Sequence, residues 1–515
     1  MSFSIRPRPD WCCTGHVSRY SRLSSRSYSG NRRRRPPRSN RLNRHDEKKK
    51  NISGEDTIAA IITPPGEGGI GAIRISGPDS PSIIRKIFKP ADPNTEPGRF
   101  FHLYYGYIVD KQGDIIDEVT MVGMPRGQSY TGQNQAEIFC HGGQFVLKRI
   151  LDEIYKHKVR PAEPGEFTKR AFLAGKIDLA RAEAVADLIA SKTEYSYSAA
   201  RNNLLGRMSE YILVIRKAAV ELLAEIEASI DYPEEEIETA EQERLLDSID
   251  DIISRVRELA DSYQAGQIIK EGYRIAIAGR PNAGKSSLFN LLLNQNRAIV
   301  AATPGTTRDY LTEWIDLDGI AVSITDTAGL RSRAGQVEKA GQISAMNIIN
   351  DSDLVIWIAD ISRKRWQLEL AGDIEDLPDR SKVVAALNKI DKVESYDRKA
   401  VTITPDISGL SGCIAISCKT GEGFKSLRKM LARRINNNMP DLTDRLVVTS
   451  ARHKQKLDNF LASFRLAEKS IAQSESPELT ALELRRGINE IDEITGRVYN
   501  DEILENIFSR FCIGK

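Results

Sequence analysis

Residues 279–286 read Gly-Arg-Pro-Asn-Ala-Gly-Lys-Ser, which matches the spacing GxxxxGK[ST] of a phosphate-binding loop. An apolar segment at 274–278 precedes them and a helical pattern follows. In this setting the backbone N–H groups of the loop and the helix N-terminus can hold phosphate oxygens. We expect Lys285 to reach the β- and γ-phosphates and the Ser286 hydroxyl to ligate Mg²⁺. The residues expected around the phosphates are Asn282, Ala283, Gly284, Lys285, Ser286 and Ser287.

Two later segments are suited to complete the site of the metal and the γ-phosphate. Residues 305–309 read Gly-Thr-Thr-Arg-Asp, and Thr307 can enter the Mg²⁺ shell when a γ-phosphate is bound. Residues 326–329, Asp-Thr-Ala-Gly, follow an apolar strand. Asp326 can therefore support the metal, and the N–H of Gly329 can meet the γ-phosphate.

Two further segments indicate which base is bound. Residues 388–391, Asn-Lys-Ile-Asp, end another strand and supply Asn388, Lys389 and Asp391. The Asp391 carboxylate can accept from the N1–H and the exocyclic amine of guanine, a donor pair that adenine lacks. Ser417 begins a Ser-Cys-Lys segment that would back the base. All these segments in this order predict a GTP-hydrolysing enzyme.

The group that orients the attacking water is less obvious. Ras-like GTPases use a glutamine directly after the DxxG glycine, but Leu330 stands at that position. Glu338, in the following helix, is the nearest polar candidate, although the residues alone favour a solvated surface glutamate, because lone glutamates are common on surfaces. Asn282 could help to hold a monovalent cation where other GTPases place the charge of an arginine.

The elements that position these residues alternate between strands and helices. Apolar strands are expected at 274–278, 322–325, 354–359, 383–387 and 413–416. Because helical segments separate most of them, we expect a parallel sheet covered on both faces. Helical periodicity flanks this region, from Asp178 to Leu259 and again after Asp441. Before it lies a Gly- and Pro-rich block of short strands and helices, which predicts a mixed α+β domain.

Composition places the chain in a broad class. It is 40% hydrophobic and 28% charged, and no apolar run approaches the roughly 18 residues of a membrane helix. The six cysteines show neither metal-ligand spacing nor a disulfide framework. We therefore expect a soluble intracellular protein with no membrane insertion.

The first 45 residues differ from the rest, with twelve arginines and nine serines against one acid, Asp10. Such an Arg- and Ser-rich, acid-poor start is typical of a mitochondrial transit peptide. We expect residues 1–50 to be a transit peptide or disordered, and the protein to act in the mitochondrial matrix. A basic arm that contacts nucleic acid and a nuclear-localisation patch are the alternatives.

Six further segments carry a specific pattern: Asp56–Gly69, Ser129–Gly132, Cys140–Gly143, Pro164–Phe172, Gly175–Ile189 and Phe511–Lys515. Together with the nucleotide motifs they closely resemble the MnmE/TrmE family of tRNA-modifying GTPases. The likeness covers nearly everything after residue 55. Two departures are that 332–336 lacks the usual acidic residues and that Ala301 replaces a frequent hydroxyl residue.

The resemblance implies a GTPase that acts with a flavin-containing partner of the MnmG/GidA type. Such pairs place an aminomethyl-type substituent on carbon five of the wobble uridine of certain tRNAs, using a tetrahydrofolate derivative as one-carbon donor. The resemblance also implies a homodimer, contact with tRNA directly or through the partner, and K⁺-stimulated hydrolysis in which Glu338 positions water. The implied ligands of Mg²⁺ or K⁺ are Ser286, Thr307, Asn282 and Thr306.

The resemblance further implies a folate site formed by Arg74, Glu137, Lys176 and Lys515. Cations suit the glutamate carboxylates of folates, and a carboxylate suits the donors of the pterin ring. Taken alone, Arg74 and Glu137 are compatible with solvent-side charges on strands, and Lys176 with a residue that flanks a helix start.

These expectations divide the chain into five parts. Residues 1–50 form the leader, 54–175 the α+β folate-binding and dimerisation domain, and 269–436 an α/β P-loop GTPase domain. Residues 176–268 and 437–515 form two parts of one all-α domain. The competing hypothesis is a ribosome-assembly GTPase, a timing switch on RNA with a similar nucleotide core. The folate-type block and the Cys-Ile-Gly-Lys end argue against it.

Overall fold

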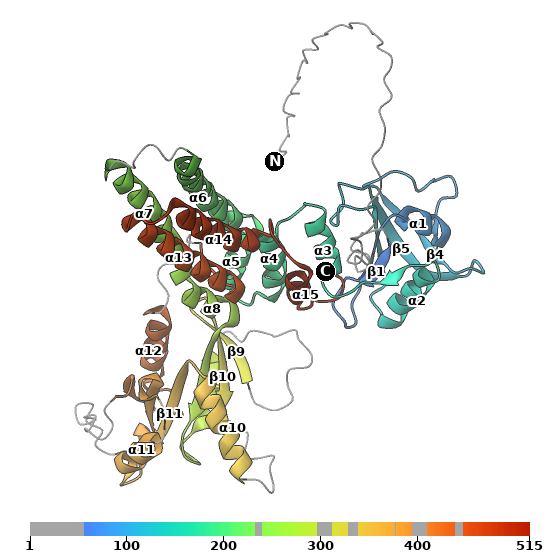
Figure 1. Ribbon diagram of the computed structural model, residues 1–515. Coiled ribbons are helices and arrows are strands. Elements are labelled where there is room, and N and C mark those ends of the chain that lie inside the picture. Colours follow the sequence, from blue (N-terminus) through green and yellow to red (C-terminus); the bar gives the residue numbers. More distant parts are fainter. Residues whose placement is uncertain are drawn as a thin grey trace, which may run out of the picture. The chain divides into compact units, whose positions relative to one another are not determined.

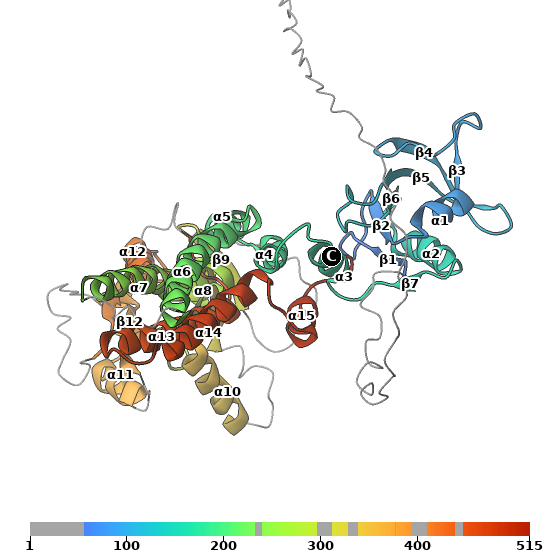
Figure 2. The same cartoon turned by 45° about the horizontal axis from the view of Figure 1, so that its top comes forward.

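The computed structural model describes residues 56–231, 239–295, 312–327, 338–375, 377, 379–393, 409–437 and 446–515. Figures 1 and 2 show three groups of elements along the chain: a sheet with short helices, a helical bundle and a second sheet flanked by helices. This matches the multidomain class expected from the sequence. Among the described residues, no helix is both long and apolar enough to cross a membrane.

The first group is a sheet with strand order β3-β4-β5-β6-β2-β1-β7. Its elements are β1 (Ile58–Ile61), β2 (Gly71–Ser76), α1 (Ser80–Ile87), β3 (Phe88–Pro90), β4 (Leu103–Val109), β5 (Ile115–Met124), β6 (Gln135–Cys140), α2 (Gln144–Tyr155), β7 (Arg160–Pro161) and α3 (Glu166–Leu173).

Side chains of this sheet alternate between its two faces. Ile73 and Ile75 of β2 are buried in one cluster with residues of α1 and α2, so these helices cover one face. On the other face, Phe167 of α3 packs with Ile58 of β1 and half-buried Tyr130. Arg74 of β2 lies on this second face because it alternates with the two isoleucines. The first domain therefore presents Arg74 toward α3.

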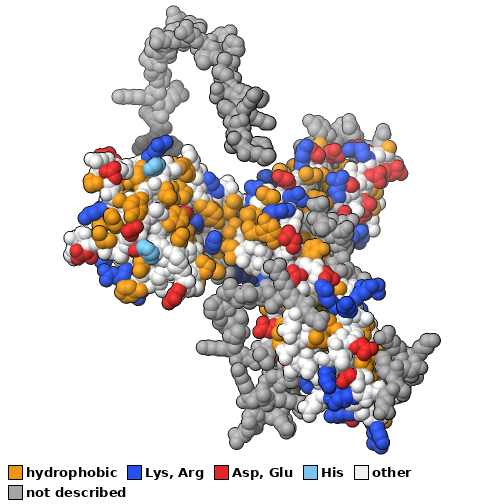
Figure 3. Space-filling model, turned by 180° about the vertical axis from the view of Figure 1, so that it is seen from behind, with side chains coloured by type: hydrophobic (Ala, Val, Ile, Leu, Met, Phe, Trp, Pro, Cys, Tyr) orange, Lys and Arg blue, Asp and Glu red, His pale blue; other side chains and the backbone are white. Residues whose placement is uncertain are grey.

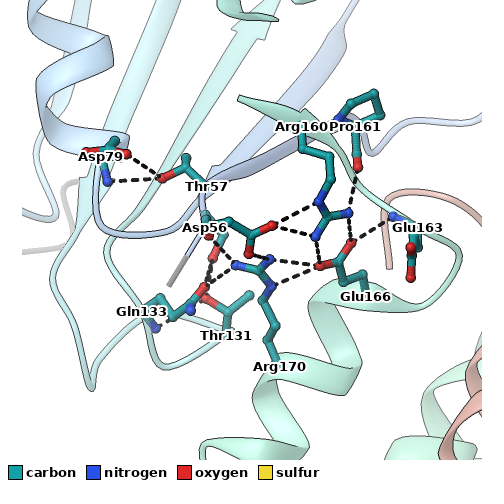
Figure 4. Close-up of polar contacts among 11 residues, drawn as sticks. Asp56, Thr57, Asp79, Thr131, Gln133, Arg160, Pro161, Glu163, Glu166 and Arg170 are labelled. Atoms are coloured by element: carbon teal, nitrogen blue, oxygen red, sulfur yellow. Dashed lines mark hydrogen bonds and ion pairs between the residues drawn. The ribbon is translucent and has the colours of Figure 1, made fainter. Parts of the chain in front are cut away.

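A network of charged side chains attaches α3 to the start of β1 (Figure 4). The Arg170 guanidinium donates to the Asp56 carboxylate over 2.7 Å and to Glu166 over 2.8 Å. Arg160 donates to Glu166 over 2.7 Å and forms an ion pair with Asp56. Burial alone would raise the pKa of Asp56, but the hydrogen bond from Arg160 and the charge of Arg170 lower it. Each carboxylate is thus ionised and shared by two arginines, which fixes α3 on the sheet.

The second group is a helical bundle built from two distant parts of the chain. Its helices are α4 (Leu179–Ala190), α5 (Glu194–Leu204), α6 (Arg207–Asp231), α7 (Thr239–Asp261), α8 (Tyr263–Glu271), α13 (Ala451–Ala472), α14 (Pro477–Thr495) and α15 (Asp501–Phe508). Helices α13 and α14 lie beside α6 and α7 in both ribbon views (Figures 1 and 2). One apolar cluster joins them, with Ile215, Val256, Phe460 and Leu484 fully buried.

The chain leaves and re-enters this bundle at adjacent points. The backbone N–H of Val448, just before α13, donates to the Ser262 hydroxyl, just before α8, over 3.0 Å. A Cβ atom at Gly266 of α8 would lie 2.1 Å from the Val448 carbonyl oxygen. Only glycine permits this close approach of the two segments.

The third group is a sheet with strand order β13-β12-β11-β8-β10-β9. Its elements are β8 (Tyr273–Ala278), α9 (Lys285–Gln295), β9 (Thr312–Leu317), β10 (Ile320–Asp326), α10 (Glu338–Asp351), β11 (Leu354–Asp360), α11 (Trp366–Glu375), β12 (Val383–Asn388), β13 (Gly412–Ala415) and α12 (Phe424–Asn437). Helices α9 and α12 share a core cluster with one face, and α10 and α11 with the other. The expectation of a sheet covered on both faces is therefore confirmed.

The five strands expected from the sequence run parallel as predicted, but the sheet has a further edge strand, β9, that was not expected. Strand β9 pairs antiparallel to β10, whereas the other neighbours run parallel. Asp318 and Gly319 connect β9 to β10 with φ values of 56° and 91°. An Asp-Gly pair with left-handed backbone is a preferred two-residue hairpin turn, and it reverses the chain directly.

Candidate GTP-binding and folate-binding sites

The phosphate loop lies between β8 and α9, at the carboxyl edge of the sheet. Gly279, Asn282 and Gly284 have φ values of 139°, 61° and 110°, so the backbone turns repeatedly into the left-handed region. Lys285 is 8% exposed as a residue, and its ammonium donates to the carbonyl oxygens of Gly279 and Arg280 over 2.8 and 2.9 Å. The loop therefore curves around the ammonium group that is expected to meet phosphate.

Asn388 at the end of β12 joins the phosphate loop to the segment that follows β13. Its side-chain amide donates to the Ala283 carbonyl over 2.8 Å, and its oxygen accepts from the Cys418 N–H over 3.0 Å. The next residue, Lys389, donates to the Asn282 carbonyl over 2.8 Å and to the Asp360 carboxylate over 2.6 Å. These bonds hold the base-side and phosphate-side loops in one frame.

Asp391 is held with its carboxylate ionised. The Ser417 hydroxyl donates to it over 2.6 Å, and this hydrogen bond is the main reason that its pKa lies below the usual value. Burial, and secondarily the charge of Asp391, raise the pKa of the neighbouring Cys418 thiol to about 11. An ionised carboxylate beside a neutral thiol provides an acceptor edge and an apolar surface, which suits a guanine ring.

Ser286 and Asp326 meet where a metal ion is expected. The Ser286 hydroxyl donates to the Asp326 carboxylate over 3.0 Å, and Asp326 is 2% exposed. Within the described segments, no group of three or more His, Cys, Asp or Glu side chains could hold a metal. One hydroxyl and one carboxylate fit Mg²⁺, which keeps several waters and takes further ligands from substrate phosphates.

These residues surround a single cavity of about 1150 Å³. Its lining includes Asn282, Gly284, Lys285, Ser286, Ser287, Asn388, Lys389 and Asp391. Ala283 is buried and contributes its carbonyl oxygen to Asn388, and Ser417 acts through Asp391. The volume exceeds that of a usual small-molecule site, and phosphate and base ends are both present, as a nucleoside triphosphate requires.

Four predicted positions lie wholly or partly outside the described residues. Thr306, Thr307 and Gly329 fall in the undescribed segments 296–311 and 328–337. Glu338 is the first residue of α10, but its side chain is not among those described. The proposed roles of these four residues stay predictions.

Arg74 and Glu137 are brought together on neighbouring strands. They are register partners on β2 and β6, and the guanidinium donates to the carboxylate over 2.9 Å. Both side chains are 13% exposed, so neither is a solvent-side charge. The guanidinium also lies 5.0 Å from the Tyr130 ring centroid and 5.4 Å from that of Phe167. The Arg74 guanidinium is thus within cation–π distance of two aromatic rings.

The other two predicted folate residues approach from different segments. The Phe167 N–H donates to the Lys515 carbonyl oxygen over 3.1 Å, which places the end of the chain against α3. The Lys176 ammonium donates to the Gly127 carbonyl over 2.9 Å, on the loop that carries Tyr130. Cys512 is exposed, and its carbonyl accepts from the Gly165 N–H. The main chain of Lys515 therefore contacts Phe167, the residue whose ring lies near Arg74. Lys176 instead contacts the loop that carries Tyr130.

Sequence reasoning missed three contributors to these sites. Asp360, the last residue of β11, pairs with Lys389, and its position at the carboxyl end of an apolar strand was the available signal. Tyr130 and Phe167 lie within two of the six segments that carry the family resemblance, but nothing in their spacing showed that their rings lie near Arg74.

Comparison with known proteins agrees with this geometry. The family model described as "MnmE helical domain" matches residues 179–512, and "GTP-binding protein TrmE N-terminus" matches 57–176. A protein of Carboxydothermus hydrogenoformans named "tRNA modification GTPase MnmE" is 41% identical over 471 residues, covering 90% of this chain and 100% of the relative. Relatives of the same name from Natranaerobius thermophilus and Clostridioides difficile are 38% and 39% identical, each covering 90% of this chain and 100% and 99% of their own lengths. The chain belongs to the MnmE/TrmE family of tRNA modification GTPases.

Proposed function

We propose that this GTPase, acting with a flavin-containing partner protein, modifies carbon five of the wobble uridine of mitochondrial tRNAs. A tetrahydrofolate derivative bound by the N-terminal domain supplies the one-carbon unit, and K⁺ stimulates GTP hydrolysis. The observation that carries the folate part is the half-buried Arg74–Glu137 pair, whose guanidinium lies near the Tyr130 and Phe167 rings. Such a site offers a cation for glutamate carboxylates, a carboxylate for pterin donors and flat surfaces for the ring.

The proposed role of K⁺ draws support from Asn282. Its backbone φ of 61° is stabilised by the bond from Lys389 to its carbonyl oxygen, while the residue stays exposed at the rim of the nucleotide cavity. No hydrogen bond of the Asn282 side chain occurs within the described part of the chain. Its amide oxygen is therefore available to a cation beside the phosphates.

The proposed homodimer draws support from apolar side chains on the N-terminal domain, where Figure 3 shows many hydrophobic atoms at the surface. On β4, Leu103 and Tyr105 point to the same face and are 57% and 50% exposed. Phe100, Phe101 and Ile115 are exposed nearby in sequence, at 46%, 57% and 62%. An apolar surface of this kind is typical of an interface.

The mitochondrial assignment rests on the Arg- and Ser-rich composition of residues 1–45. A fluorescent fusion of the full chain should enter mitochondria, and deletion of residues 1–50 should leave it outside. Equal import of the two forms would contradict the assignment.

The central experiment is mass spectrometry of mitochondrial tRNA nucleosides from cells that lack the protein. Loss of a carbon-five wobble-uridine modification, restored by the wild type but not by Glu338→Ala, is the expected result. An unchanged nucleoside profile together with defective ribosomal subunits would favour the ribosome-assembly hypothesis instead.

Folate binding is tested separately by calorimetry with tetrahydrofolate. Glu137→Gln should weaken binding about tenfold or more, because it removes the charge that holds Arg74 and faces the pterin donors. Glu96→Gln, at an exposed position of the same domain, is the matched control and should bind normally. Equal affinity of the two variants would remove Glu137 from the site.

A further inference from the structure

Helix α12 of the GTPase domain has an unusual charge composition. Its fourteen residues include Lys425, Arg428, Lys429, Arg433 and Arg434, and no Asp or Glu. Residues 1–45 carry twelve arginines and one aspartate, which gives this segment a net charge of +11, whereas the net charge of the whole chain is +3. The remaining chain therefore carries −8. Helix α12 is thus a strongly basic segment on an otherwise acidic protein.

Packing fixes which face of α12 is exposed. Phe424, Leu427, Leu431 and Ile435 are buried in the core against the sheet, so the helix cannot rotate. The opposite side is a ridge formed by Lys425, Lys429 and Arg433, all of which are exposed. We call these three residues the α12 ridge.

The cations of the α12 ridge have no ionic partner in the part of the chain that the structure describes. Arg428, on a neighbouring line of the helix, pairs with Asp318 over 2.7 Å. Lys425, Lys429 and Arg433, in contrast, form no ion pair with any described residue. Their spacing of four residues places successive charges about 6 Å apart along the helix axis. An evenly spaced row of cations without ionic partners among the described residues suits a regularly repeating polyanion rather than a single small anion.

The position of α12 relates this ridge to the nucleotide. The helix begins directly after residues 417–423, in which Ser417 holds Asp391 and Cys418 holds Asn388. A macromolecule bound on α12 would therefore contact the element that continues from the guanine loop.

We propose that the α12 ridge binds the phosphate backbone of tRNA. The inference rests on the function as a tRNA modification GTPase, and it assigns part of the tRNA contact to the GTPase domain itself. An acidic protein surface is the other partner that a basic ridge could accept. The even spacing and the nucleic-acid substrate of the family favour RNA.

The test uses the full-length protein and a fluorescently labelled tRNA transcript, with affinity measured by anisotropy at several KCl concentrations. Lys425→Gln with Lys429→Gln should weaken binding about tenfold near 100 mM KCl. It should also reduce the slope of log K against log [KCl] by about 1.5, because two phosphate contacts are lost. GTP hydrolysis in the absence of RNA should be unchanged, which also reports correct folding.

The matched control is Arg465→Gln with Lys469→Gln, two exposed cations at the same spacing on α13. This control should bind tRNA within twofold of the wild type. Equal affinity of the α12 variant and the wild type, or equal losses in both variants, would overturn the proposal. If the α12 variant binds tRNA normally but fails to restore wobble modification in cells, the ridge binds a protein partner and the proposal is wrong. Failure of the wild type itself to restore modification would instead contradict the proposed function.

Discussion

The side-chain amide of Asn388 donates to the carbonyl oxygen of Ala283 across 2.8 Å. This one bond connects the end of β12 to the phosphate loop, while Asn388 also accepts from the loop behind the base. The geometry of the phosphate loop is therefore coupled to that of the guanine-binding segments. A substitution in one of them should alter the geometry of the other.

Gly284→Ala should strongly weaken GTP binding. A Cβ atom at Gly284 would lie 2.2 Å from the Asn388 amide nitrogen, and a φ of 110° is strained for alanine. We expect a loss of about 100-fold or more in GTP affinity, measured by titration with a fluorescent GTP analogue. Gly421→Ala is the control, since φ is 80° there but no atom lies within 4 Å. Similar losses in both variants would show that backbone strain, rather than Asn388, is responsible.

Asp391→Asn should shift base preference from guanine toward xanthine. An amide presents a donor where guanine also presents one, whereas the xanthine oxygen can accept from it. The ratio of GTP to XTP affinity should fall by about 100-fold or more in competition binding. Because Ser417 keeps Asp391 ionised, the wild-type preference should persist well below neutral pH. Retained guanine preference in the variant would refute the base assignment.

Glu338→Ala should bind GTP with unchanged affinity yet hydrolyse it about 100- to 1000-fold more slowly, as loss of a group that orients water predicts. Single-turnover hydrolysis, with binding measured in parallel, separates the two effects. Glu338→Gln, which keeps a hydrogen-bonding side chain, should lose less activity. Normal turnover in Glu338→Ala would remove this residue from the mechanism.

Asn282→Gly should reduce the advantage of K⁺ over Na⁺ in GTP hydrolysis. Glycine removes the amide side chain yet tolerates the φ of 61°, so the loop keeps its shape. The measured quantity is the ratio of the rates in KCl and NaCl at equal ionic strength, which should approach one. A ratio equal to that of the wild type would exclude a role of this side chain in cation binding.

The helical bundle should lose stability on acidification because of His453. This side chain is 4% exposed, and burial lowers its pKa to about 4, despite Glu183 at 3.3 Å. Between pH 6.5 and 4 the unfolded chain therefore binds a proton that the folded chain does not. The stabilisation is present above pH 6.5 and falls by about 2 kcal/mol at pH 5. Thermal unfolding at pH 7 and pH 5 should show a smaller difference in His453→Gln than in the wild type.

The parts of the nucleotide site that the sequence predicts best are contiguous. Gly279 to Ser287 form the loop after β8 and the start of α9, so their spacing alone determines which groups face the phosphate. The Asp318–Gly319 turn also carried a local signal, and recognising it would have predicted the antiparallel strand β9. Local geometry of this kind depends on few residues.

Contacts between distant segments were less accessible. Arg74 and Glu137 meet because β2 and β6 pair in a particular register, and a shift by one residue would send them to opposite faces. Lys389 meets Asp360 because β11 and β12 are neighbours in the sheet. Such partners depend on strand order and register, which a single sequence does not contain, and the family resemblance alone pointed to Arg74 and Glu137.

The contact of Ser262 with Val448 has an architectural consequence. Since the outgoing and returning segments touch, both covalent connections of the intervening cassette lie side by side. Lys192, just before α5, and Tyr195 of α5 make further contacts with it. A short linker from α8 to Val448 could close the bundle after excision of the cassette, without repacking Val256 or Phe460. Insertion of a GTPase segment into an ancestral helical protein would then have required one surface loop that tolerates the insertion and no change in the packing of the bundle interior.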